Sequence, residues 1–190
     1  MTGARGAGLG GFDSTMKSFM QARNIACGQL AVARKGKLVL ARGYTWTSSS
    51  TLKTQPTSLF RIASLSKPVT AVDMVRFAAI FDSANSVLNS TSIARAFAKP
   101  ETGVQSDGSW YGCGWSVRNV TGGRNTWHTG SLPGTHTILV RRYDGLTWAA
   151  LFDQRDDASG KSYGDIDLAL HQAANAVTTW PSSNLYGSYF

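Results

Sequence analysis

Residues 60–72 read Phe-Arg-Ile-Ala-Ser-Leu-Ser-Lys-Pro-Val-Thr-Ala-Val, and our expectations for the fold and the function start from this stretch. It holds Ser64 and Lys67 three residues apart, and a helix is predicted to begin within a residue or two of Ser64. This spacing places both side chains on one face of a helix. Apolar neighbours disfavour the charged ammonium, so Lys67 would be able to take the proton of the Ser64 hydroxyl.

The same pair of residues also has a purely structural interpretation. Serine is a common N-cap, and a lysine one turn later then simply points into solvent. Pro68 fits either interpretation, because proline is tolerated in the first turn of a helix. The spacing alone favours this structural role, so the longer sequence context has to decide between the two.

That context resembles the nucleophile segment of the serine β-lactamase and penicillin-binding-protein superfamily, in particular its class C and esterase-like branch. Residues 127–134, Trp-His-Thr-Gly-Ser-Leu-Pro-Gly, resemble the Lys/His-Thr-Gly strand that lies beside the nucleophile in this family. Residues 111–115, Tyr-Gly-Cys-Gly-Trp, are similar to the strand that precedes it. The resemblance runs in order through most of residues 12–177.

The resemblance implies acyl transfer through a covalent intermediate. In this mechanism Ser64 attacks a carbonyl, and Lys67 accepts the hydroxyl proton. The backbone N–H groups of Ser64 and Ser131 would bind the oxyanion. Water then releases the acyl group, with Lys67 or His128 as the base.

The other implied site residues surround the third motif. Thr129 and Gly130 would contact the substrate, and a histidine at His128 titrates near neutral pH, unlike the lysine more often found there. The alternative for His128 is a strand histidine bonded to the sheet. The middle motif of the family is Tyr-x-Asn or Ser-x-Asn, and no tyrosine here begins such a triplet. Tyr111 is a nearby phenol, with packing beside Trp115 as its alternative role.

Two triplets match Ser-x-Asn, at residues 83–85 and 182–184, but this pattern arises easily by chance. The middle motif normally lies in a large helical subdomain inserted after the Ser-x-x-Lys helix. Fewer than 60 residues separate Lys67 from Trp127, so most of that subdomain is missing. We therefore expect a shallow, open site that is better suited to small activated esters or exposed amide bonds than to a tightly held β-lactam, with small esters preferred.

The expected fold class is α+β, a reduced β-lactamase/transpeptidase-like fold. An antiparallel sheet of about five strands would carry the N- and C-terminal helices on one face and the Ser-x-x-Lys helix on the other. We expect a flexible tail over residues 1–11, one catalytic domain over residues 12–180, and a second tail over residues 181–190. Hydrophobic periodicity predicts helices at 12–22, 64–80, 90–98 and 165–177, and strands at 27–33, 38–46, 116–120, 126–129, 135–142 and 147–154.

Composition bounds the partners. The chain has 190 residues, 42% of them hydrophobic, and a formal charge of +8 without a dense basic run, which argues against nucleic-acid binding. The sequence has no residue cluster with metal-ligand spacing, and we expect no cofactor. Neither a signal peptide nor a membrane span is recognisable, so we expect a soluble chain of undetermined compartment. Cys27 and Cys113 are expected to be buried free thiols, with a single disulfide bridge as the alternative.

These features favour a serine hydrolase whose partner is a small-molecule ester, amide or β-lactam. A hypothesis from a different class is a catalytically impaired remnant of this fold that binds ligands or serves as a structural module. The missing subdomain supports it, because the excision removes the middle motif and bares apolar surface. Such a surface also allows a homodimer in which a second chain covers the open cleft.

Overall fold

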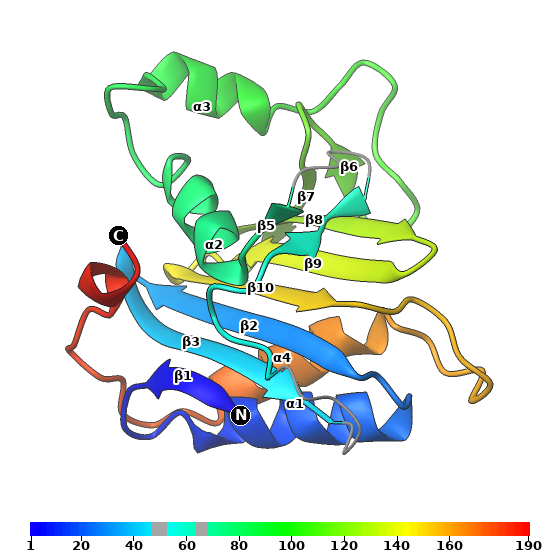
Figure 1. Cartoon of the computed structure of the whole chain (residues 1–190). Helices are drawn as coiled ribbons and strands as arrows, with labels where there is room; N and C mark the ends of the chain where they lie inside the picture. Colours follow the sequence, from blue (N-terminus) through cyan, green and yellow to red (C-terminus); the bar gives the residue numbers. More distant parts are fainter. Residues whose placement is uncertain (47–52, 64–67) are drawn as a thin grey trace.

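The computed structural model describes residues 1–46, 53–63 and 68–190. Its centre is an antiparallel sheet with helices on both faces (Figure 1). The helices are α1 (Gly10–Ala22), α2 (Ala71–Ala79), α3 (Ser90–Ala96), α4 (Asp165–Asn175) and the short 3-10 helix η2 (Tyr186–Ser188). The sheet has eight strands in the order β1 (Thr2–Arg5), β3 (Lys37–Thr45), β2 (Cys27–Arg34), β10 (Leu146–Phe152), β9 (Thr135–Arg141), β8 (Gly123–Leu132), β7 (Ser116–Val120) and β6 (Trp110–Tyr111). A separate two-stranded ribbon consists of β4 (Phe60–Arg61) and β5 (Pro68–Val69).

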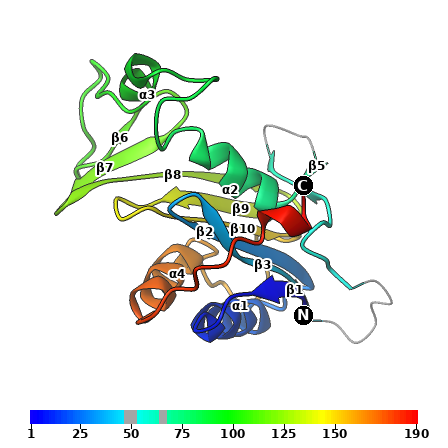
Figure 2. The ribbon, with the colours of Figure 1, turned by 90° about the vertical axis from the view of Figure 1, so that its left-hand side faces the viewer.

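The central strand β10 divides the interior into two cores. All seven of its residues are buried, and successive side chains of a strand point to opposite faces. Phe152 therefore packs with α1 and α4 on one face, whereas Leu151 packs with α2 on the other. Figure 2 shows the sheet between these two helical layers. The α+β class, and the placement of the terminal helices opposite the helix after Lys67, are confirmed.

The layer of α1 and α4 is held by a buried arginine. The Arg23 guanidinium donates to the backbone oxygen of Ser162 at 2.7 Å and pairs with Asp165 at 2.6 Å. It also lies 3.9 Å from the centre of the Phe19 ring. Because Arg23 follows α1 and Asp165 begins α4, this contact fixes the two helices against each other.

The N-terminal segment differs from the loose tail expected for residues 1–11. Residues 2–5 form β1, which pairs with β3, and Gly6 donates its backbone N–H to Val39 at 2.8 Å. Backbone pairing of this kind needs no apolar pattern, so hydrophobic periodicity gave no signal. The sheet has more strands than expected for the same reason, because β1 and the two-residue β6 carry almost no side-chain pattern.

The C-terminal residues are also attached to the sheet. The backbone N–H of Leu185 donates to Leu38 at 2.8 Å, and the Asn184 side chain accepts from the Leu38 N–H at 3.1 Å. Tyr186 and Tyr189 pack against the core beneath α2. Residues 181–190 are therefore anchored to β3, which differs from the tail that we expected there.

Both cysteines are free thiols, as expected, but neither is fully buried, because Cys27 is half-buried and Cys113 is exposed. Cys113 follows β6 in a glycine-rich turn, where the short strand leaves little side-chain cover. Over the described ranges, none of the helices is long and apolar enough to cross a bilayer.

Candidate functional site

Ser64 and Lys67 lie outside the described residues, so the first motif is located by its flanks. Phe60 pairs with Val69 and Arg61 with Pro68, in antiparallel register. The chain from residue 62 to residue 67 therefore connects two paired strands. The first motif belongs to this connection between β4 and β5.

Helix α2 begins later than we predicted. Pro68 belongs to β5, and the N-cap of α2 is Thr70. Its hydroxyl accepts from the Asp73 N–H at 3.0 Å, while the Asp73 carboxylate accepts from the Thr70 N–H at 2.9 Å. This capping box satisfies donors at the start of the helix, so the prediction of a helix from Ser64 with Pro68 in its first turn was wrong.

Ala63, the last described residue before Ser64, has an unusual backbone. It is buried, and its φ is +66°, in the left-handed region that alanine rarely adopts. Such a conformation costs of order 1–3 kcal/mol and persists only where the surroundings fix it. Strained residues of this kind are frequent at active sites. The chain is thus constrained directly before the serine of the first motif.

The third motif, on β8, lies against this same point. A β-carbon added to Gly130 would be 3.2 Å from the Ile62 carbonyl oxygen and 3.3 Å from the Ala63 β-carbon. Only a glycine lets the two segments approach so closely. On the neighbouring strand, the Thr135 hydroxyl donates to the Arg61 carbonyl at 2.6 Å. The structure therefore brings the His-Thr-Gly segment beside the residues that precede Ser64.

Strand β8 has an open edge at this point. On one side, residues 126–132 of β8 pair with β9. On the other side, β7 pairs only with residues 123–127, so the strand partner on that side ends at Trp127. Leu132 and Thr135 flank a two-residue turn, so the backbone groups of Leu132 face β9. Alternation along the strand then points the backbone N–H of Ser131 toward the open edge. An oxyanion donor requires this orientation.

Side chains of β8 alternate between the two faces. His128 and Gly130 lie on the α2 face, because His128 pairs with Leu139 of that core. Thr129 pairs with Ile138 of the opposite core, so its side chain, like that of Ser131, points to the α1/α4 face. Thr129 was expected to contact substrate, and its side chain is not brought together with His128. Its backbone groups share the open edge.

Tyr111 and His128 form a hydrogen-bonded pair. The Tyr111 hydroxyl lies 2.9 Å from Nε2 of His128, and the two rings meet edge to face. Tyr111 comes from β6, so the contact joins two strands of the sheet that β7 separates. Both side chains are exposed. The alternative roles considered for these residues, packing beside Trp115 and bonding to the sheet, do not account for this contact.

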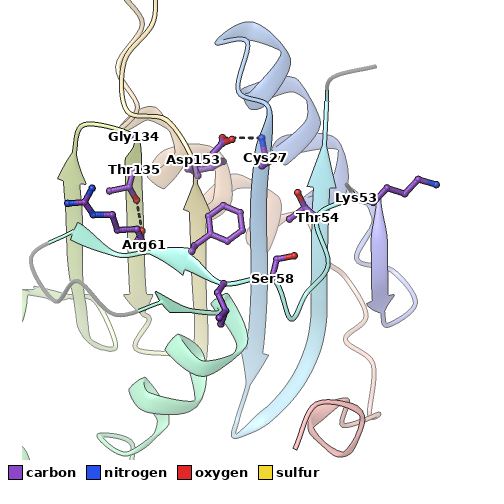
Figure 3. Close-up of a pocket in the computed structure, with 11 residues that line it drawn as sticks. Cys27, Lys53, Thr54, Ser58, Arg61, Gly134, Thr135 and Asp153 are labelled. Atoms are coloured by element: carbon purple, nitrogen blue, oxygen red, sulfur yellow. Dashed lines mark hydrogen bonds between the residues drawn. The ribbon is translucent and has the colours of Figure 1, made fainter. Parts of the chain in front are cut away.

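A cavity of about 390 Å³ lies next to Arg61, on the side of β9 and β10 (Figure 3). Asp153 and Cys27 line it together, and the Cys27 backbone N–H donates to the Asp153 carboxylate at 3.0 Å. Burial raises the pKa of both side chains, and the neighbouring carboxylate raises the pKa of the Cys27 thiol further. Cys27 therefore remains a protonated thiol at neutral pH, which makes it a poor nucleophile.

Two contacts around the site were missed by sequence reasoning. Thr135 anchors the Arg61 carbonyl, and Gln29 bonds to the chain on both sides of the first motif. The available signal for Gln29 was a polar residue inside an apolar strand. For the described ranges, no group of three or more His, Cys, Asp or Glu side chains could hold a metal ion.

A sequence model of the β-lactamase family matches residues 12–80. The match includes Ser64, Lys67 and the ribbon that carries them. Residues 12–80 are 69 of the 190 residues, so the β-lactamase likeness that the match shows is that of this segment.

Among solved structures, the chain is similar to SurE in complex with D-Leu, at 16% identity and a TM-score of 0.46, over 71% of this chain and 34% of that one. It is also similar to a D-stereospecific amidohydrolase from Streptomyces sp., at 13% identity and a TM-score of 0.38, over 65% and 39% of the two chains. The third is the octameric penicillin-binding protein homologue from Pyrococcus abyssi, at 14% identity and a TM-score of 0.42, over 87% and 38%. The chain spans less than two fifths of the length of each.

Proposed function

We propose that the chain is a serine hydrolase that acts on small esters or amides through a covalent acyl-enzyme. The observation that carries this proposal is the close approach of Gly130 to Ile62 and Ala63. It supports the proposal, because it brings Gly130 close to the residues that directly precede Ser64.

In the proposed reaction, Ser64 attacks the substrate carbonyl while Lys67 accepts the hydroxyl proton. The oxyanion is held by the backbone N–H groups of Ser64 and Ser131, and one such donor is typically worth about two to three powers of ten in rate. The bond from the carbonyl carbon to the leaving group then breaks, and an amine or alkoxide takes up a proton as it departs, whereas an activated phenolate leaves without one. Support for the Ser131 donor comes from the open edge of β8, where its N–H faces outward.

The Tyr111–His128 pair supplies the proton path that the missing middle motif would otherwise provide. A phenol hydrogen-bonded to an imidazole can pass a proton in either direction, and general acid–base groups of this kind contribute about 10²–10⁴ in rate. The 2.9 Å contact and the place of His128 two residues before Gly130 on β8 support this role. In deacylation, Lys67 or His128 activates the water that releases the acyl group.

The substrate class follows from the openness of the site. Tyr111, His128 and the edge of β8 are exposed, and between α2 and β6 the chain has only the short helix α3. Few walls are available to hold a bulky β-lactam. We place the chain in the class C and esterase-like branch, with small esters as the preferred substrates.

The test is covalent labelling of Ser64. The protein is incubated with a fluorophosphonate and separately with a penicillin, and the adduct is mapped by mass spectrometry. Ser64→Ala should abolish the fluorophosphonate adduct and the hydrolysis of p-nitrophenyl esters. Ser66→Ala, two residues away in the same stretch, is the matched control and should keep both. Ester hydrolysis by Ser64→Ala at the parent rate would overturn the proposal, and absence of any adduct would favour the non-catalytic remnant.

A further inference from the structure

Gln29 is a polar side chain at the centre of the sheet. It lies on β2, where its neighbours are Gly43 of β3 and Leu151 of β10, and it is 0% exposed. A buried amide is costly unless its hydrogen bonds are satisfied. In the described structure they are satisfied by the backbone of other segments.

The amide makes three hydrogen bonds. Its Nε2 donates to the carbonyl oxygens of Gln55 at 2.5 Å and Ser58 at 2.8 Å, while its Oε1 accepts from the Ala71 N–H at 3.0 Å. The reversed orientation would place Oε1 against two carbonyls and the NH₂ group against an N–H. The partners therefore define the orientation of the amide.

These partners flank the first motif on both sides. Gln55 and Ser58 lie just before β4, and Ala71 is the first residue of α2. Between them run β4, β5 and the connection that contains Ser64 and Lys67. A single side chain from the sheet thus holds both ends of the segment that carries the proposed nucleophile.

The sheet is shaped to receive this segment. A β-carbon added to Gly43 would lie 2.1 Å from the Thr54 carbonyl oxygen, so the chain before Gln55 passes directly over β3. The Thr54 N–H also donates to the Thr45 hydroxyl at 2.8 Å. The chain before β4 is therefore also attached to β3 without the help of Gln29. The Gln29 amide links this part of the chain to the start of α2.

We propose that Gln29 is a positioning residue for acyl transfer, which sets the location of Ser64 relative to β8 by joining the two ends of its segment. This inference rests on the proposed hydrolase function. A misplacement of about 1 Å in a reacting group can cost about 100-fold in rate, so the amide affects catalysis without touching substrate.

The test compares two substitutions of similar shape. Gln29→Met keeps the volume but removes all three hydrogen bonds. Gln154→Met is the matched control, because Gln154 donates to the Arg23 carbonyl at 3.0 Å and the Tyr163 hydroxyl at 2.8 Å on the α1/α4 face. At a temperature where both variants are folded, we expect Gln29→Met to slow fluorophosphonate labelling of Ser64 by about 10- to 100-fold. The control should stay close to the parent.

Gln29→Glu should make the rate of Ser64 labelling depend on pH, which a purely stabilising role of Gln29 would not do in the folded protein. A protonated glutamic acid keeps one donor and one acceptor, whereas the ionised form loses the donor and faces two carbonyls. The labelling rate of this variant relative to the parent should therefore rise as the pH falls. This variant also keeps the test valid if Gln29→Met does not fold.

Hydrogen exchange separates failure of this inference from failure of the proposed function. Gln29→Met should accelerate amide exchange in residues 55–60 and 68–73 and leave α1 and α4 unchanged. If the parent is not labelled at all, exchange alone decides whether Gln29 positions the segment. Equal labelling by folded Gln29→Met and parent, or unchanged exchange on both flanks, would overturn the inference.

Discussion

The Tyr111 hydroxyl lies 2.9 Å from Nε2 of His128, and this contact joins β6 to β8 across the intervening strand β7. The His128 side chain stands on the same face of β8 as Gly130, which closely approaches the residues before Ser64. The sheet thus holds a proton carrier on the strand that approaches the residues before Ser64.

Tyr111→Phe should separate ester from amide hydrolysis. An amide nitrogen needs a proton to leave, whereas an activated phenolate leaves without one. We expect the variant to lose about 100-fold in kcat/KM for an amide substrate and less than about 10-fold for a p-nitrophenyl ester. Tyr143→Phe removes the hydroxyl of a similarly exposed tyrosine and is the control. Equal losses on the two substrates would exclude Tyr111 as the source of the leaving-group proton.

Gly130→Ala should impair the site by increasing the distance between β8 and the residues before Ser64, because it removes none of the reacting groups. The added β-carbon would lie 2.5 Å from the Thr137 hydroxyl and 3.2 Å from the Ile62 carbonyl, so β8 and the first motif must move apart. We expect about a 100-fold loss in the rate of Ser64 labelling. Gly11→Ala, on α1, meets no atom within 4 Å and should label at the parent rate. Normal labelling by Gly130→Ala would show that the close approach is dispensable.

Stability should fall below neutral pH because of His136. Its ring lies in β9, near Phe152 and Tyr163, and burial lowers its pKa. As the pH falls, the unfolded chain therefore binds a proton at His136 before the folded chain does. The contribution of neutral His136 to the free energy of unfolding is complete above about pH 6.5 and is lost as the pH falls toward the folded pKa.

The measurement is the free energy of unfolding in urea between about pH 8 and pH 5. His136→Gln should flatten its decline on the acid side, although not abolish it, because burial also lowers the pKa of His171. His128→Gln removes an exposed histidine and serves as the comparison. If the two variants flatten the profile equally, burial of His136 is not the cause.

Asp13→Ala should destabilise the fold without altering the site. The buried carboxylate of Asp13 pairs with Arg5 at 2.9 Å and accepts from the Tyr44 hydroxyl at 2.8 Å, so it ties α1 to β1 and β3. The substitution leaves the buried Tyr44 hydroxyl without its acceptor, which costs about 1–3 kcal/mol, whereas the partly exposed Arg5 can be hydrated. Thermal unfolding should show the loss as a fall in Tm of about 5 °C. Unchanged stability would mean that the Asp13 network contributes little to the free energy of unfolding. The control is the rate of Ser64 labelling in the folded variant, which should equal that of the parent.

Hydrophobic patterning predicted the parts of the fold that bury side chains. The hairpin of β2 and β3, the strands β9 and β10, and the helices α1 and α4 all follow from apolar periodicity. Strand β1 was not predicted because its pairing uses only backbone groups. The start of α2 was misplaced because the Ser-x-x-Lys spacing was given more weight than the capping signal of Thr70 and Asp73.

The candidate site could be predicted only as two separate motifs. The resemblance named the segments around Ser64 and His128, and their roles stay predictions because Ser64 and Lys67 are not among the described residues. The contact between Tyr111 and His128 depends on how β6, β7 and β8 stack, which no local pattern encodes. Gln29 was missed because one polar residue in an apolar strand looks like a minor irregularity until its partners are known.

The central position of β10 has a consequence for folding. Residues 54–58 and Ala71 are bonded to β2 and β3, whereas residues 128–132 pair with β9, and β10 is the strand that joins these two halves of the sheet. Its register pairs Phe152 with Gly28, a contact of very long range in the sequence, and such contacts form slowly. During refolding the nucleophile segment and its partner strand are therefore independent until β10 inserts. The rate at which activity recovers would then report when β10 pairs with both halves of the sheet. A fragment limited to residues 12–80 would contain Ser64 but would lack β8.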